Sequence, residues 1–135
     1  EWEYACRAGT GTDFGHEGGA SALGEYAWIS ENAGGKSHPV GQKKPNLWGL
    51  HDMHGNVCER VGDFYHRDYY KNSPKQDPTG PDGRFGNGNN GTTILRGGTW
   101  KCNPDACRAG KRLRGGGYAH YENWGFRCAV TVEGD

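Results

Sequence analysis

Two cysteines, Cys102 and Cys107, are the residues of this sequence most suited to chemistry. They flank Asn103-Pro104-Asp105, which are turn-forming residues. Gly97-Gly98 precedes them and lets the backbone turn or lets another chain approach closely. Two thiols on either side of a turn can form a disulfide, bind a soft metal ion together or act as a reactive thiol pair. The residues alone leave these three alternatives open.

A second set of candidate ligands lies in the polar loop expected at residues 51–62. Asp52 and Glu59 carry carboxylates, and Gly55 permits a tight bend whose carbonyl groups can point inward. A hard cation such as calcium takes six to eight oxygen ligands from such a loop. The alternative is a turn stabilised by Asn56 and its own acidic residues, and composition alone favours this alternative. His51 and His54 could share a site, but we expect hydrogen-bonded loop histidines.

The elements that must position these residues are short. Ile94 and Leu95 predict a core strand over 94–96 that leads into the glycines. Residues 1–8 predict a helix that ends at Gly9, and residues 124–132 show the clearest strand pattern. We expect one more short strand at 27–29, and loops or irregular structure at 9–25, 51–62, 71–92 and 107–124.

The composition predicts one loop-rich domain. The chain has 135 residues, of which 25 are glycine, and its many aromatic residues argue against disorder. Lysine and arginine balance aspartate and glutamate, which argues against a dedicated nucleic-acid binder, and no apolar run is long enough to span a membrane. The sequence does not begin with methionine, so we interpret it as a mature product or a fragment. A targeting signal therefore cannot be used to infer the cellular compartment.

The cysteine count is odd, so at least one of the five cysteines has no partner within the chain. A bridge between Cys6 and Cys128, near the two ends, would stabilise the fold by roughly 4–5 kcal/mol in the chain-entropy model. Such a bridge needs an oxidising compartment or a protected site, so an oxidised pair would favour an extracytoplasmic or secreted location.

Several motifs occur in an order that resembles the formylglycine-generating enzyme family, also called the sulfatase-modifying factor domain. The family domain is longer than this chain, so residues 1–135 resemble the C-terminal part of one such domain, which an N-terminal segment or a partner chain would complete. The motifs are E-W-E-Y-A-C-R-A-G at 1–9, H-P-V-G-Q-K-K-P-N-L-W-G-L-H-D-M-H-G-N-V at 38–57, D-P-T-G-P at 77–81, L-R-G-G-T-W at 95–100 and G-F-R at 125–127.

The resemblance implies an α+β fold of the C-type-lectin-like type, with short antiparallel strands, two helices and long ordered loops. It also implies a structural calcium ion bound by the side chains of Asp52 and Glu59 and the carbonyls of Gly55 and Val57. In catalytic members a disulfide joins the positions that match Cys6 and Cys128.

For the cysteine turn, the resemblance implies a copper(I) site. Cys102 and Cys107 match the two active-site cysteines, and Thr99 matches a serine of the catalytic enzymes. Those enzymes use copper and oxygen to convert a cysteine of a protein substrate, a sulfatase, to formylglycine. Two thiolates are suitable ligands for Cu(I).

Some residues depart from the catalytic pattern and favour a non-catalytic alternative. Cys58 stands where tryptophan is usual, and Arg60 replaces a common aromatic residue. A third thiol near the pair would fill the position of the substrate cysteine. The alternative is a ligand-binding module like the retroelement-diversified variable proteins of the family, with a protein or peptide ligand. Its expected surface comprises Lys101, Leu113, Tyr118, His120, Tyr121 and Trp124. Whether the chain is an enzyme stays open on the sequence.

Overall fold

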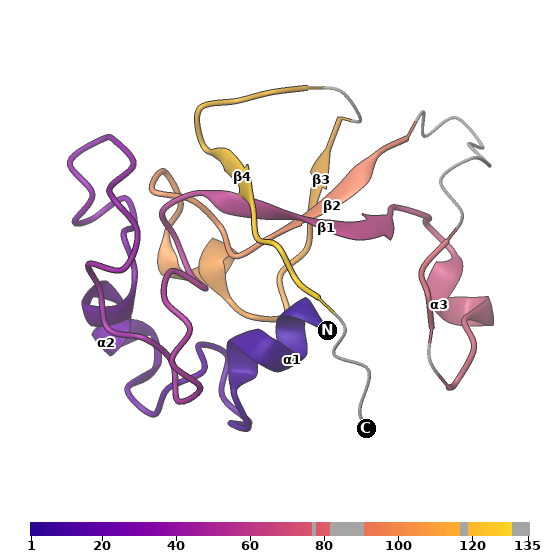
Figure 1. The fold of residues 1–135 in the computed structure, drawn as a ribbon, viewed down its shortest axis with the longest axis horizontal. Coiled ribbons are helices and arrows are strands. Elements are labelled where there is room, and N and C mark those ends of the chain that lie inside the picture. Colours follow the sequence, from indigo (N-terminus) through magenta and orange to yellow (C-terminus); the bar gives the residue numbers. More distant parts are fainter. Residues whose placement is uncertain (77, 82–90, 117–118, 131–135) are drawn as a thin grey trace.

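A four-stranded sheet forms the centre of the fold in the computed structural model, which describes residues 1–76, 78–81, 91–116 and 119–130 (Figure 1). The strands lie in the order β3-β2-β1-β4. β1 (Cys58–Phe64) runs antiparallel to β2 (Thr93–Arg96) and parallel to β4 (Trp124–Phe126), and β3 (Leu113–Gly115) runs antiparallel to β2.

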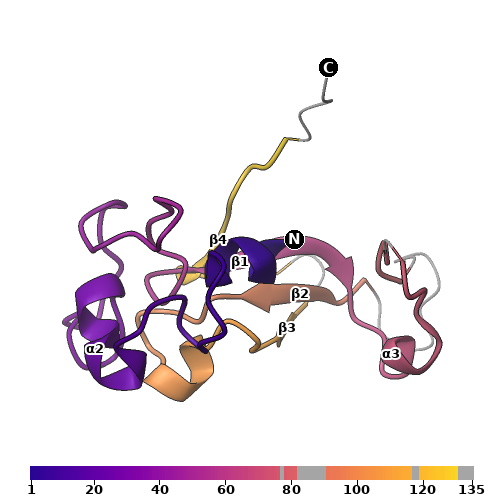
Figure 2. The same ribbon diagram turned by 90° about the horizontal axis from the view of Figure 1, so that it is seen from below.

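The helices are short and lie around this sheet. They are α1 (Trp2–Arg7), α2 (Gly19–Tyr26), α3 (Tyr69–Asn72) and the 3-10 helix η1 (Pro104–Cys107). Both ribbon views place α2 at one end of the sheet and α3 beyond the other end (Figures 1 and 2). None of the helices in the described parts of the chain is long and apolar enough to cross a membrane.

β2 is the strand that anchors the core, and it confirms the strand predicted at 94–96. All four of its residues are buried, and Ile94 and Leu95 fill the interior between β1 and β3. Arg96 is buried because its guanidinium group binds Glu3 of α1 at 2.6 Å and the carbonyls of Gly110 and Lys111. This buried, hydrogen-bonded arginine ties α1 to the sheet.

α1 confirms the helix predicted over residues 1–8. It ends at Ala8, which takes the left-handed conformation at φ 48° ahead of Gly9. Its Cys6 packs with Met53 and Ala109 in one core cluster. A second cluster joins Phe14, Leu23, Ala27, Ile29 and Cys107, with Cys102 packed against it.

Five expectations for secondary structure were wrong or only partly right. The predicted loops at 9–25 and 51–62 contain α2 and the first part of β1, and the irregular stretch at 107–124 contains β3. Of the strand predicted at 124–132, only Trp124–Phe126 is a strand within the described residues 124–130. Residues 27–29 contribute a single bridge between Trp28 and Gly55. Tertiary pairing with short partner strands, rather than local propensity, sets these boundaries.

Candidate active site

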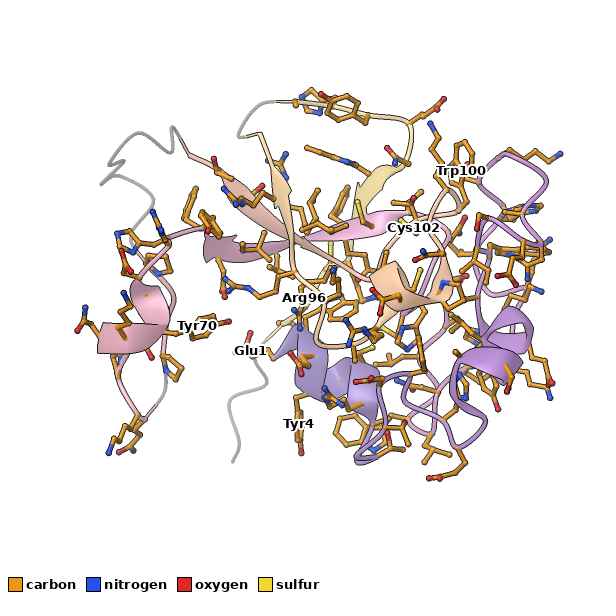
Figure 3. All side chains as sticks on the ribbon, turned by 180° about the vertical axis from the view of Figure 1, so that it is seen from behind. Glu1, Tyr4, Tyr70, Arg96, Trp100 and Cys102 are labelled. Atoms are coloured by element: carbon orange, nitrogen blue, oxygen red, sulfur yellow. The ribbon has the colours of Figure 1, made fainter. Side chains whose placement is uncertain are left out.

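The segment that follows β2 builds a thiol site against α2 and η1 (Figure 3). Gly97 and Gly98 have φ of 91° and 74°, a conformation that favours glycine. A Cβ atom on Gly98 would lie 2.5 Å from the Cys107 sulfur, so this position needs glycine for a second reason. The close approach confirms the interpretation of the glycine pair as a turn that admits a neighbouring segment.

Backbone hydrogen bonds hold the cysteine turn in place. The Cys102 amide donates to the Thr99 carbonyl at 2.9 Å, and the Ser30 amide donates to the Cys102 carbonyl at 3.0 Å. Asn103 caps η1, because its side-chain oxygen accepts from the Ala106 amide at 3.1 Å. The predicted turn at 103–105 is therefore the start of a capped 3-10 helix that carries Cys107.

The two cysteines of this turn form one hydrogen-bonded pair of unequal partners. The Cys107 thiol donates to the Cys102 sulfur and lowers the pKa of Cys102 to about 5, while burial opposes the shift and Thr99 assists it. The Thr99 hydroxyl lies 3.4 Å from the Cys102 sulfur. The same hydrogen bond, followed by burial, raises the pKa of Cys107. Cys102 is half-buried and Cys107 is fully buried, so the shifts favour the thiolate at Cys102 and the thiol at Cys107.

Cys58 lies on β1 near this pair. Its thiol is buried and donates to the Asn123 carbonyl at 3.4 Å. Burial, followed by the charge of Cys102, raises the pKa of Cys58 to about 12. The described residues contain no group of three or more cysteine, histidine or acidic side chains placed to hold a metal ion. A role for Cys58 as a third sulfur ligand stays a prediction.

The loop predicted to bind calcium has one acidic residue with a free oxygen and one that is already neutralised. Asp52 is buried, and one carboxylate oxygen accepts from the Gly41 amide at 2.7 Å. Its other oxygen is buried without a partner among the described residues. Glu59 instead accepts from Trp2 at 2.7 Å and from Arg127, whose Nη2 lies 2.8 Å away. Asp52 fits a cation, whereas Glu59 would have to exchange Arg127 for it.

Comparison with known proteins gives the family of this chain. Residues 1–132 match the sulfatase-modifying factor enzyme 1-like domain. The chain belongs to this family. A formylglycine-generating enzyme of Streptomyces coelicolor is 33% identical over 98% of the chain and 45% of its own length. A serine/threonine-protein kinase Pkn1 of Chlamydia trachomatis is 37% identical over 70% of the chain and 15% of its own length.

Solved structures confirm the α+β, C-type-lectin-like fold of this sulfatase-modifying factor domain. Treponema denticola variable protein 1 superposes with a TM-score of 0.81 at 35% identity, over 93% of this chain and 43% of its own. PvdO from Pseudomonas aeruginosa gives 0.72 at 28% identity, over 93% of this chain and 48% of its own. The chain thus spans less than half the length of these relatives.

The two terminal cysteines of this sulfatase-modifying factor domain are both free thiols. Cys128 is exposed, and Cys6 is buried with its sulfur 3.4 Å from Nε2 of His54. The disulfide implied by the family is not formed in this structure. A bond between the two in oxidised protein stays a prediction.

The expected binding surface is only partly contiguous. Lys101 pairs with Glu122 at 2.7 Å and lies over the Trp100 ring, and Tyr121 stacks at a tilt on Trp124. His120 is exposed in the same segment, whereas Leu113 lies on β3, whose Gly115 is approached by the Trp124 ring. Tyr118 lies outside the described residues. Lys101, Tyr121 and Trp124 remain the centre of this candidate surface.

The structure adds one residue to the site. His54, expected to be a loop histidine, is buried with Nδ1 at 2.7 Å from the Cys107 carbonyl oxygen. The two residues are 53 positions apart, so no local spacing could have joined them.

Proposed function

We propose that this domain is a copper-dependent oxidase of the formylglycine-generating type, acting on a cysteine of a protein or peptide substrate. The observation that carries the proposal is the Cys102–Cys107 pair. The Cys102 sulfur is half-exposed with a lowered pKa, and Cys102 packs against the buried cluster that contains Cys107. The likeness to the formylglycine-generating enzyme of Streptomyces coelicolor supports the same reading.

The two sulfurs fit Cu(I), which prefers soft thiolate ligands. The lowered pKa of Cys102 favours its thiolate, and Cys107 would release its proton when the ion binds. Bound copper would supply the activation of dioxygen. Thr99 would hold the Cys102 sulfur in place through its hydroxyl group, and the half-exposed side of Cys102 offers the approach for a substrate thiol.

The proposed reaction balances with an external thiol as reductant. The substrate CH2SH group becomes CHO, and its sulfur leaves as hydrogen sulfide. One oxygen atom of dioxygen enters the aldehyde and the other leaves as water. The thiol reductant supplies the two electrons and two protons that this stoichiometry requires.

Copper titration tests the proposal most directly. Reduced protein is titrated with Cu(I) against a competing chelator, and one ion per chain is expected. Cys102→Ser and Cys107→Ser should each abolish this binding. With a cysteine peptide, dioxygen and a thiol reductant, mass spectrometry should then detect the aldehyde. Wild-type protein that binds no Cu(I), or both variants binding it normally, would overturn the proposal.

A second function, non-catalytic recognition of a protein or peptide ligand, is favoured by two observations. The chain is similar to a Treponema variable protein along most of its length, and Cys58 and Arg60 depart from the catalytic pattern. Lys101, Tyr121 and Trp124 would form the contact surface. Under this alternative, substitutions at these three residues remove ligand binding while Cys102→Ser leaves it unchanged.

A further inference from the structure

His54 occupies the core between α1 and the thiol pair. Its ring is buried, with Nδ1 at 2.7 Å from the Cys107 carbonyl oxygen and Nε2 at 3.4 Å from the Cys6 sulfur. Cys6 and Cys107 are themselves fully buried. The ring edge of His54 also meets Phe14, at 5.8 Å between ring centroids. The side chain is therefore held on several sides.

The contacts of His54 fix its tautomer. A carbonyl oxygen can only accept, so Nδ1 must carry the proton and donate to Cys107. Burial lowers the pKa of His54, although the carbonyls of Cys107 and Phe14 oppose the shift, so the ring is neutral at pH 7. Nε2 can then accept from the Cys6 thiol at 3.4 Å, and the Met53 carbonyl oxygen, 3.9 Å from the same sulfur, is the other acceptor for that proton. Burial raises the pKa of Cys6 to about 12. Each ring nitrogen has a suitable partner.

The hydrogen bond from His54 reaches the residue that controls Cys102. Cys107 ends η1, and Cys102 packs against the buried cluster that contains Cys107. Backbone groups of Gly55 and Thr99 also hydrogen-bond the Cys107 sulfur, so its position is set from the segment next to His54. A shift of the Cys107 backbone would change the contact between the two sulfurs.

We infer that His54 is a positioning residue, whose Nδ1 donor fixes the Cys107 backbone and thereby holds the two sulfurs together for metal binding. The metal-binding part of this inference rests on the proposed function, whereas the positioning of the thiols does not. When a residue that positions a metal ligand is removed, the metal affinity of the site typically falls by about 10–100-fold.

Two substitutions distinguish positioning from general packing. His54→Asn keeps a side-chain donor close to the position of Nδ1, whereas His54→Gln moves the donor toward the position of Nε2. We expect His54→Gln to weaken Cu(I) binding by about tenfold or more, and His54→Asn by less than about threefold. At pH 7, iodoacetamide should alkylate Cys102 several-fold more slowly in His54→Gln than in His54→Asn. Cys6→Ala, which removes only the partner of Nε2, is the matched control and should leave both readouts near wild type.

Several outcomes would overturn the inference. If His54→Asn and His54→Gln lose Cu(I) affinity and Cys102 alkylation rate equally, and their melting temperatures fall equally, His54 has a packing role alone. Unchanged binding and alkylation in both would show that His54 does not position the pair. If His54→Gln does not fold, slow alkylation in a folded His54→Asn decides against the inference. Wild-type protein that fails to bind Cu(I) would reject the proposed function, whereas the alkylation rates would still test the positioning.

Discussion

At the scale of single residues, one hydrogen bond makes the two site cysteines chemically different. The bond from Cys107 stabilises charge on Cys102 and removes it from Cys107. Because only the thiolate is a nucleophile, Cys102 should be alkylated at a rate that is nearly flat above about pH 6 and falls below pH 5. An ordinary cysteine instead gains about tenfold in rate per pH unit up to about pH 8.5. Mass spectrometry of peptides after short labelling pulses measures the profile.

Cys107→Ala is the control for that profile. It removes the hydrogen-bond donor, so the inflection of the Cys102 rate should move to higher pH. A profile for wild-type Cys102 that rises steadily from pH 6 to pH 8.5 would contradict the assigned thiolate.

The Glu59 carboxylate gives the second residue-scale prediction. Glu59→Gln leaves the Arg127 guanidinium without its carboxylate and should lower the free energy of unfolding by about 2–3 kcal/mol, because Glu59 is buried. Breaking a fully buried ion pair costs about 3–5 kcal/mol. The expected loss of stability is smaller here because Arg127 is partly exposed. Glu25→Gln removes an exposed pair with Lys44 and should leave stability unchanged. Urea denaturation compares the two, and equal effects would contradict the structural role of Glu59.

At the scale of elements, the glycine turn between β2 and the cysteine segment is the critical connection. Gly98→Ala would add a methyl group 2.5 Å from the Cys107 sulfur, in addition to the strain of its φ of 74°. Gly49 has a similar φ of 79° with open space around its missing Cβ, so Gly49→Ala carries the strain alone. We expect Gly98→Ala to destabilise the fold by about 1–3 kcal/mol more than Gly49→Ala, through overpacking. Thermal unfolding measures the difference, and Gly98→Ala should also lower Cu(I) affinity while Gly49→Ala should not.

The elements that sequence reasoning recovered are those whose signals are local. Ile94 and Leu95 precede two glycines and identify β2, and Trp2 to Cys6 followed by Gly9 identify α1. α2 was missed because Gly19 and Gly24 weaken its helical pattern, although Leu23 is fully buried. β1 was missed because Glu59 and Arg60 interrupt its apolar pattern, and Glu59 is buried only through distant Arg127 and Trp2.

The candidate site divides in the same way. Cys102, Cys107 and Gly98 lie in one short segment, so their proximity could be predicted from the sequence. The bond between His54 and Cys107, the neutralisation of Glu59 by Arg127 and the inward-facing Cys6 depend on contacts between distant segments. Such contacts follow from the packing of the whole chain, which a local pattern does not contain.

At the scale of the whole molecule, the loop of 52–56 joins segments that carry little regular structure. Asp52 accepts from the Gly41 amide, and the side chain of Asn56 bonds both the amide and the carbonyl of His38. Asp52 itself has a φ of 56°, in the left-handed region, and leaves one buried carboxylate oxygen without a described partner. A cation at this oxygen would offset the cost of burying the charge and would strengthen the junction of these loops.

We therefore expect calcium to stabilise the folded chain. An ion that binds only the folded state stabilises it by about 2.7 kcal/mol at a hundred times its dissociation constant, which corresponds to a rise in melting temperature of several degrees. Asp52→Asn should abolish this rise. Glu25→Gln, which replaces an acidic residue of an exposed ion pair, should retain it. Differential scanning fluorimetry in calcium and in chelator measures the effect. If the wild-type melting temperature is the same in calcium and in chelator, there is no calcium site at Asp52. If Glu59→Gln still shows the rise in calcium, Glu59 is not a calcium ligand and serves only as the partner of Arg127.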